Sequence, residues 1–319
     1  PDGMENARRQ AQAAAKFLGV EEDRVLVAST GVIGQRLNIE CIEENIGNLK
    51  LSDNGSEVAS HAILTTDTKV KSVAIEFTVG GKTCHIGGIA KGSGMIHPNM
   101  GTMLGFITTD CNITHEMLQI ALVESVRRSY NRVSVDGDTS TNDMCIVMAN
   151  GLAGNEQIDW QNEDFDKFYQ ALHEVNVRLA RMIAGDGEGA TKLITCTVKG
   201  ARSEEAAERL AKAVCASSLV KAAMFGADAN WGRVLCAMGY SKAPFRPEYV
   251  TVSFSSSVGS VMVCDHGYGL EFDEDLAKQI LLEDEVNIDV ELYEGEEKAT
   301  CWGCDLTYDY VKINGDYRT

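Results

Sequence analysis

The sequence predicts a mixed α/β fold. Hydrophobic residues make up 44% of the 319 residues and charged residues 24%, which is typical of a globular protein with a large core. Segments with strand-like alternation and segments with helical spacing follow one another, without a strict βαβ rhythm. No run of about 18 or more apolar residues occurs, so we expect no membrane span.

The first half of the chain predicts helices at residues 4–18 and 114–130 and strands at 24–28 and 102–108. The first helix is rich in Ala, Arg and Gln and stops at Gly19. Between these segments, residues 73–79 alternate apolar and polar side chains, Gly80 and Gly81 turn the chain, and residues 82–89 return. This pattern predicts a β-hairpin.

The second half predicts a long helix at 162–184, a strand at 192–198 and a helix from Ser203 to about Met224. Short β segments are expected at 250–256, 260–264 and 287–293. Near the end, Trp302 to Ile313 is an apolar-rich, β-like run that we expect to dock on the core. The compositional seam near residues 185–192 predicts a smaller C-terminal α/β subdomain from about 192–319.

Charge and cysteine usage exclude several classes of protein. The net charge of −18 repels phosphate backbones, so we expect no nucleic-acid partner. Most of the ten cysteines sit in apolar runs, which is typical of small buried hydrophobes in a reducing, cytoplasmic compartment. The single close pair, Cys301 and Cys304, lacks the second pair that a structural zinc site needs, so we expect no metal.

The segment from Ala90 to Leu104 is the most informative one. A glycine-rich loop leads to Thr102 at the start of an apolar strand, and Gly101 allows backbone conformations that are closed to other residues. Cleavage before Thr102 would leave a free α-amine with a pKa of roughly 7.7–8.0, a suitable base for the threonine's own hydroxyl. From chemistry alone, a structural glycine turn before a strand is the favoured interpretation.

Three further segments carry polar groups in turns. Ser29 to Gly34 could hold an oxyanion on a hydroxyl and a glycine N–H, whereas a phosphate-binding loop would need a Lys after the glycines. Asn131 to Asp143 crowds three carboxylates and four hydroxyls. It lacks the closing Glu of a calcium loop, so we interpret it as a hydrogen-bonded structural or substrate-proximal loop. In Gly185 to Lys192, glycines flank Glu188, which could hold a substrate ammonium group or be a solvated loop acid.

Taken together, these segments resemble the ornithine acetyltransferases (glutamate N-acetyltransferases) of arginine biosynthesis. The resemblance also includes Asp228 to Arg233, Cys301 to Val311 and the ending Asn314 to Thr319, and it covers essentially the whole chain in order. It implies a self-processing, N-terminal-nucleophile-like fold of layered sheets and helices. The precursor would cut itself between Gly101 and Thr102 into an α chain of residues 1–101 and a β chain of residues 102–319. These would associate as a heterotetramer of two α and two β chains.

The resemblance further implies the reaction and the residues that perform it. Thr102 would accept the acetyl group of N2-acetylornithine and pass it to glutamate, with no metal or redox cofactor; some members also accept acetyl-CoA as donor. Thr30 and Gly31 fall where the family keeps its oxyanion hole. The positions that match substrate-binding residues are Thr65, Lys91, Thr102, Glu188, Asn314 and Thr319.

Two departures from the family pattern and two alternative functions accompany this interpretation. Family members usually begin several dozen residues earlier, so we expect the α chain to be N-terminally incomplete, and Gly101 stands where many members have Ala. A self-processing aminopeptidase of related architecture would release free acetate instead of forming N-acetylglutamate. A non-catalytic amino-acid-binding protein would bind ornithine without forming an acetyl-enzyme.

Overall fold

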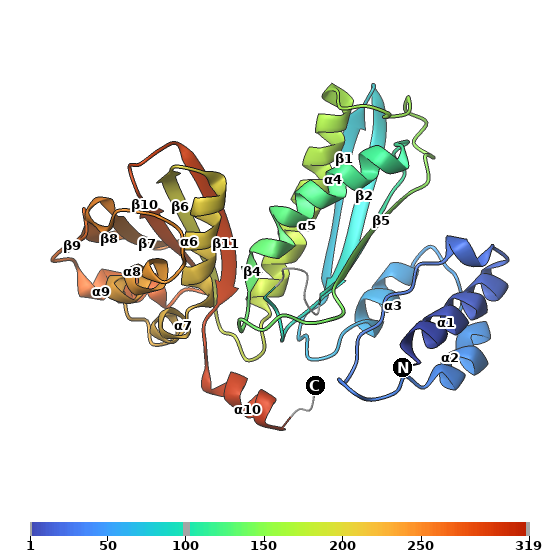
Figure 1. Ribbon diagram of the computed structural model, residues 1–319, viewed down its shortest axis with the longest axis horizontal. Coiled ribbons are helices and arrows are strands. Elements are labelled where there is room, and N and C mark those ends of the chain that lie inside the picture. The colour runs from blue at the N-terminus through green and yellow to red at the C-terminus, as the bar shows by residue number, and fades with distance from the viewer. Residues whose placement is uncertain (1, 98–102, 317–319) are drawn as a thin grey trace.

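The computed structural model describes residues 2–97 and 103–316, and it confirms the mixed α/β class (Figure 1). A four-stranded sheet stands at the centre of the view, with the three N-terminal helices to its right. A seven-stranded sheet with its own helices lies to the left, and the C-terminal helix lies below the two. Expected site residues Gly101, Thr102 and Thr319 fall outside the described residues.

The elements have the following bounds. The helices are α1 (Gly3–Leu18), α2 (Ile39–Asn45), α3 (Gly55–Ala62), α4 (His115–Arg127), α5 (Glu163–Gly185), α6 (Glu204–Ala216), α7 (Ser218–Phe225), α8 (Trp231–Gly239), α9 (Glu274–Leu281) and α10 (Tyr308–Asp316). The strands are β1 (Lys71–Val79), β2 (Lys82–Lys91), β3 (Leu104–Thr109), β4 (Val133–Ser134), β5 (Met144–Ala149), β6 (Leu193–Ala201), β7 (Thr251–Ser256), β8 (Gly259–Asp265), β9 (Tyr268–Gly269), β10 (Glu285–Glu291) and β11 (Glu297–Cys304). Within residues 2–97 and 103–316, no helix combines the length and the apolar character needed to cross a bilayer.

The first sheet has the strand order β1-β2-β3-β5, and α4 and α5 pack over one of its faces. The expected hairpin is confirmed: β1 pairs with β2 around Gly80 and Gly81, which have φ angles of 53° and 74°. Strand β2 then pairs antiparallel with β3, from Ile86 opposite Thr109 to Lys91 opposite Leu104. The glycine-rich loop therefore leaves and re-enters this sheet at the same end, where Lys91 of β2 lies opposite Leu104 of β3.

The second sheet has the order β4-β11-β6-β10-β7-β8-β9, and it is covered by α6, α8 and α9. Its strands come from Leu193 onward, except for β4. That two-residue strand follows α4 and pairs with β11, with Val133 opposite Trp302. Arg132, which is 7% exposed, adds ion pairs to Glu204 at 2.6 Å and Glu208 at 3.1 Å. The chain between α4 and β5 thus joins the two halves.

Two sequence expectations about helices and strands are wrong in detail. The single helix at 203–224 is two helices, because Ser217 ends α6 and its hydroxyl accepts the N–H of Val220 to begin α7. The strand at 24–28 does not form. Arg24 ends a short 3₁₀ turn, and a strand needs a neighbouring strand, which no described segment provides there.

The expectation for the chain's end is also wrong. Strand β11 ends at Cys304, and α10 follows in place of a continued β run. Asp305 accepts the backbone N–H groups of Thr191 and Lys192, which turns the chain, and the Thr307 hydroxyl accepts the N–H of Tyr310. A threonine in this position caps the start of a helix. None of the described side chains of α10 is buried.

The cysteines are free thiols, and most are buried as expected. The buried ones are Cys84, Cys111, Cys196, Cys215, Cys264, Cys301 and Cys304. Cys301 in β11 lies opposite Cys196 on the neighbouring strand β6, and both are free thiols. The Cys304 thiol accepts a hydrogen bond from the Lys221 ammonium at 3.3 Å. No group of three or more potential ligands in the described part of the chain could hold a metal ion.

A buried ion-pair network links the start of the first sheet to the loop after α5. Lys71 is fully buried, and its ammonium lies 2.7 Å from Asp67 Oδ1 and 2.6 Å from Asp186 Oδ2. Asp186 also accepts the N–H groups of Thr68 and Lys69, and Asp67 accepts that of Gly92. Burial alone would raise the pKa of Asp67, but the hydrogen bonds from Lys71 and Gly92 lower it, so the carboxylate stays ionised.

Replacing Lys71 by Met should therefore destabilise the protein strongly. The variant removes the ion-pair partner of the buried Asp186 and leaves Asp67 only the more distant Lys91, which costs about 3–5 kcal/mol in the free energy of unfolding. Lys82→Met, at an exposed position of β2, is the matched control and should change stability little. Urea unfolding monitored by circular dichroism measures both; equal midpoints for the two variants would contradict the role given to Lys71.

Candidate functional site

One cavity of about 250 Å³ collects most of the residues that the sequence singled out. It lies where the N-terminal segment, the end of β2, the 131–143 loop, the loop after α5 and α10 meet. Its lining residues are Thr30, Gly31, Val32, Ile33, Thr65, Thr66, Lys91, Gly94, Met95, Asp136, Asp138, Ser140, Thr141, Asn142, Glu188, Tyr310 and Asn314. All six expected site residues that the structure describes are among them: Thr30, Gly31, Thr65, Lys91, Glu188 and Asn314.

Lys91 supplies the positive charge of the cavity. It is the last residue of β2 and is 3% exposed, and its ammonium donates to Thr65 Oγ1 at 3.0 Å and lies 3.9 Å from Asp67 Oδ2. Burial lowers the pKa of Lys91; the charge of Asp67 opposes this, and that of Lys71 adds to it. Among the described lining residues Lys91 is the one Lys or Arg, so it is the natural partner for a ligand carboxylate.

Glu188 supplies a carboxylate to the same cavity. It is 6% exposed, and its Oε2 accepts from Asn314 Nδ2 at 2.8 Å, which connects α10 to the loop after α5. Its backbone N–H donates to the Ser93 carbonyl at 2.9 Å. The side chain therefore has a fixed position and a single described side-chain partner.

The glycines around Glu188 have a different role from the one expected. We interpreted them as room for a ligand, but protein atoms occupy that space. A Cβ on Gly187 would lie 2.7 Å from Cys304 Sγ, and one on Gly189, whose φ is +68°, would lie 2.6 Å from the Tyr310 backbone nitrogen. These glycines allow β11 and α10 to approach, and so they bring Asn314 to Glu188.

The 131–143 loop holds the glycine-rich loop through hydrogen bonds to its backbone. Asp136 accepts the backbone N–H groups of Met95 at 2.7 Å and Ile96 at 3.1 Å, and the Tyr310 hydroxyl at 3.3 Å. Met95 has a φ of 55°, which a non-glycine residue rarely adopts, and the Asp136 contacts hold it there. Sequence reasoning missed Asp136 and Tyr310 as part of the site, because the crowd of acids in the loop gave no single position priority.

Thr30 and Gly31 present unused donors. In the described part of the chain, neither the Thr30 hydroxyl nor the Gly31 N–H makes a hydrogen bond, and both residues line the cavity. A hydroxyl and an adjacent N–H without internal partners can both donate to one oxyanion.

Histidine is absent from the described lining residues. His97, within the glycine-rich loop, has its Nδ1 2.9 Å from Ser134 Oγ, and burial lowers its pKa to about 4. It is therefore neutral and held away as a structural group. Cysteine is likewise absent from this lining, whose titratable side chains in the described part of the chain are Lys91, Asp136, Asp138, Glu188 and Tyr310.

Comparisons with known proteins give one consistent result. The family model described as "ArgJ family" matches residues 1–319. The chain is 54% identical to the arginine biosynthesis bifunctional protein ArgJ 1 of Clostridium acetobutylicum, over 100% of this chain and 78% of that protein. It is 51% identical to the arginine biosynthesis bifunctional protein ArgJ of Thermotoga neapolitana, over 99% of this chain and 80% of that protein.

A solved structure is similar as well. The crystal structure of the arginine biosynthesis bifunctional protein ArgJ from Bacillus halodurans matches with a TM-score of 0.62 and 44% sequence identity. The match covers 66% of this chain and 97% of that chain. The structural match therefore agrees with the family match.

The packing around Gly94 predicts a specific loss of ligand binding. A Cβ at Gly94 would lie 2.3 Å from the Glu188 carboxylate, so Gly94→Ala must push that side chain away from Asn314. With ornithine, the ligand that the resemblance implies, as the probe, we expect the affinity to fall about tenfold or more, because a charge-assisted contact is lost, with little change in thermal stability. Gly239→Ala, where a Cβ meets open space, is the control. Calorimetric titration showing equal affinities for both variants would remove Glu188 from the ligand site.

Proposed function

The chain belongs to the ArgJ family of arginine-biosynthesis acetyltransferases, and we propose that it transfers acetyl from N2-acetylornithine to glutamate through an acetyl ester on Thr102. One observation carries the proposal: a single cavity joins Lys91, Glu188 and the free donors of Thr30 and Gly31. Thr102 lies in the chain between β2 and β3, the loop whose described residues Gly94 and Met95 line that cavity.

Self-cleavage between Gly101 and Thr102 is the first step of the proposal. The described lining offers no histidine, and a free α-amine on Thr102, with a pKa of roughly 7.7–8.0, would supply a base beside the threonine's own hydroxyl. The length of the Bacillus halodurans chain supports such a cut: from its coverage it is about two thirds as long as this chain, and so is the segment 102–319.

The two pieces would stay together after the cut. Strands β2 and β3 belong to different pieces and pair along six residues, from Lys91 opposite Leu104 to Ile86 opposite Thr109. The Lys71–Asp186 ion pair adds a buried link between the pieces. No new contact has to form to hold the site, so residues 1–101 would act as an α chain and residues 102–319 as a β chain.

The first half-reaction needs only groups of this site. Thr102 Oγ attacks the acetyl carbon of N-acetylornithine, and its proton passes to the Thr102 α-amine. Thr30 and Gly31 donate to the oxyanion. As the oxyanion collapses, the bond between the acetyl carbon and the ornithine α-nitrogen breaks. The ammonium of Thr102 gives its proton to the leaving amine, which leaves an acetyl ester and free ornithine.

The second half-reaction reverses these steps with another amino acid. The neutral α-amine of glutamate attacks the ester carbon, the bond from that carbon to Thr102 Oγ breaks, and the proton returns to the hydroxyl through the Thr102 amine. Lys91 binds the α-carboxylate that both substrates share. Glu188, with Asn314, holds the side-chain ammonium of ornithine, and Thr65 and Thr319 complete the substrate-binding set.

The remaining features of the proposal concern the wider protein. The relatives are named bifunctional, which supports a second reaction, and we propose acetyl-CoA as its donor. We also propose that two α and two β chains associate as a heterotetramer in the cytoplasm, without a metal or redox cofactor. The free and largely buried cysteines suit a reducing compartment.

Thr102→Ala should remain a single chain and form no N-acetylglutamate. Removing the hydroxyl removes the nucleophile of both the cut and the transfer. Thr83→Ala, at an exposed position of the hairpin, should split and react like the wild type. Intact mass under denaturing conditions and an assay of N-acetylglutamate test this. A Thr102→Ala protein that still splits at the same bond, or a wild type that releases more acetate than N-acetylglutamate, would overturn the proposal.

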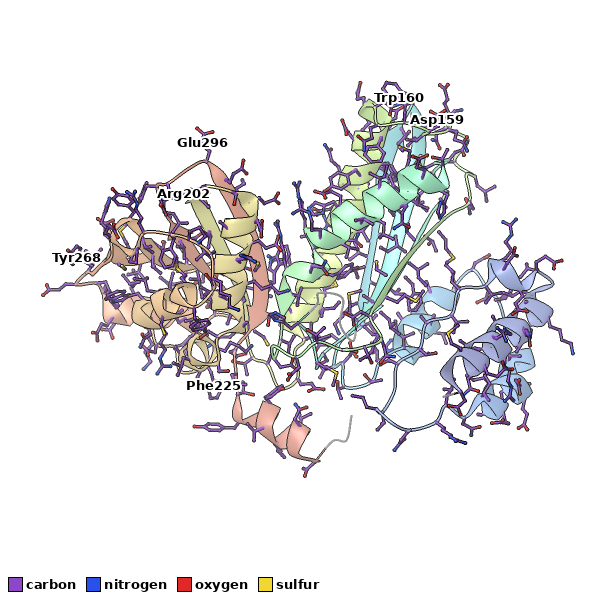
Figure 2. All side chains as sticks on the ribbon, in the orientation of Figure 1. Asp159, Trp160, Arg202, Phe225, Tyr268 and Glu296 are labelled. Carbon is purple, nitrogen blue, oxygen red and sulfur yellow. The ribbon has the colours of Figure 1, made fainter. Side chains whose placement is uncertain are left out.

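Glu188→Gln and Lys91→Ala should each lower kcat/KM for N-acetylornithine by about 10- to 150-fold, the loss expected for a charge-assisted contact. Lys91→Ala should impair the glutamate half-reaction as well, because the α-carboxylate is common to both substrates. Glu296→Gln, on the exposed connection between β10 and β11, is the isosteric control (Figure 2). Kinetics like those of this control in both site variants would exclude the two residues from substrate binding.

A further inference from the structure

The described lining of the cavity carries more negative than positive charge. Among these residues Lys91 is the one Lys or Arg, and the carboxylates are Asp136, Asp138 and Glu188. Burial raises the pKa of the Tyr310 phenol, which belongs to the same lining, and the charges of the three carboxylates raise it further. The phenol therefore experiences a negative electrostatic potential inside the cavity.

The three carboxylates differ in how far hydrogen bonds compensate their charge. Asp136 accepts three backbone N–H groups and the Tyr310 hydroxyl. Glu188 accepts from the Asn314 amide at 2.8 Å. Asp138 is exposed, and within residues 2–97 and 103–316 its carboxylate makes no hydrogen bond or ion pair. Its charge is therefore the least compensated of the three.

The backbone around Asp138 is nevertheless held in place. Its N–H donates to Asp136 Oδ1 at 3.2 Å, and the hydroxyl of the next residue, Thr139, donates to the His97 carbonyl at 2.9 Å. These hydrogen bonds tie the tip of the 131–143 loop to Asp136 on one side and to the glycine-rich loop on the other. The Asp138 side chain thus keeps its place in the cavity lining without a described donor to its carboxylate.

The two amino acids of the proposed reaction respond to this charge in opposite ways. At neutral pH ornithine carries two ammonium groups and one carboxylate, whereas glutamate carries one ammonium group and two carboxylates. A negatively charged lining stabilises bound ornithine and destabilises bound glutamate, although both can place an α-carboxylate on Lys91. We propose that Asp138 is a specificity-determining residue that favours the cationic amino acid over the anionic one. This inference rests on the proposed function.

Substitutions of Asp138 vary the charge at one place in the lining. Asp138→Glu keeps the charge, Asp138→Asn removes it and Asp138→Lys reverses it. Because Asp138 is exposed, water screens its charge, and we expect each step of one charge unit to change a constant about two- to fivefold. Added salt should shrink every such change.

The expected changes have opposite consequences for the two amino acids. In Asp138→Asn, kcat/KM for glutamate should rise about two- to fivefold, and the Kd of ornithine should rise by a similar factor. In Asp138→Lys both changes should be about four- to 25-fold, and Asp138→Glu should behave like the wild type. N2-acetylornithine has no net charge at neutral pH, so its kcat/KM is the internal reference and should change least.

Asp159→Asn and Asp159→Lys are the matched controls. Asp159 is exposed beside Trp160 (Figure 2), just before α5, whereas Glu188 follows the other end of that helix. The helix has 23 residues and is about 35 Å long, so Asp159 is remote from the cavity. Both control variants should keep the wild-type constants.

Two measurements separate this inference from the function on which it rests. Steady-state kinetics gives kcat/KM for glutamate, and calorimetric titration gives the Kd of ornithine, which needs no turnover and so reports on an inactive variant too. A purely structural role of Asp138 would weaken both amino acids together and would not follow the charge. That result, or constants in Asp138→Lys equal to those in Asp159→Lys, overturns the inference while wild-type activity stands. A wild type that transfers no acetyl to glutamate overturns the proposed function instead.

Discussion

The buried ammonium of Lys71 is the interaction on which the rest of the site depends. It lies between Asp67 and Asp186, and these two carboxylates accept the backbone N–H groups of Gly92 and Thr68. On one side, Asp67 anchors Gly92 and faces Lys91; on the other, Asp186 directly precedes the loop that carries Glu188. One fully buried cation thus links the segment that carries the basic group of the site to the segment that carries the acidic group. Because these charges are buried, removing one of them leaves the others poorly compensated.

Strand pairing provides the second constraint. Because β2 and β3 are antiparallel neighbours in one sheet, the loop between them must return to the end of the sheet that it left. Its residues Gly94 and Met95 line the cavity. The 131–143 loop holds both ends of that turn, through Asp136 at Met95 and Ile96 and through Asp143 at Met103. A peptide bond within a loop tethered at both ends can be cut without releasing either strand. This topology suits a protein that breaks its own chain and keeps its site.

The parts that the sequence could predict are those set by local patterns. Alternation around Gly80 and Gly81 predicts the hairpin, and the Ala- and Arg-rich run that stops at Gly185 predicts α5; both formed. The run after Trp302 misled because apolar content suits a strand or a helix equally, and a single cap at Thr307 decides for the helix. The glycines beside Glu188 misled because their neighbours, Cys304 and Tyr310, lie more than a hundred residues along the chain. Nothing local distinguished Asp143 from the other two carboxylates of its loop, since its partner is the backbone N–H of Met103, 40 residues earlier in the chain.

The central claim is that Thr102 carries the acetyl group on a piece of chain that begins with it. The most direct test mixes the protein with N-acetylornithine in the absence of glutamate and measures intact masses under denaturing conditions. The account predicts two chains, residues 1–101 and 102–319, with one added acetyl group on the second; adding glutamate should remove it. One uncut chain that transfers acetyl without becoming acetylated, or an acetyl group on a residue other than Thr102, would contradict it.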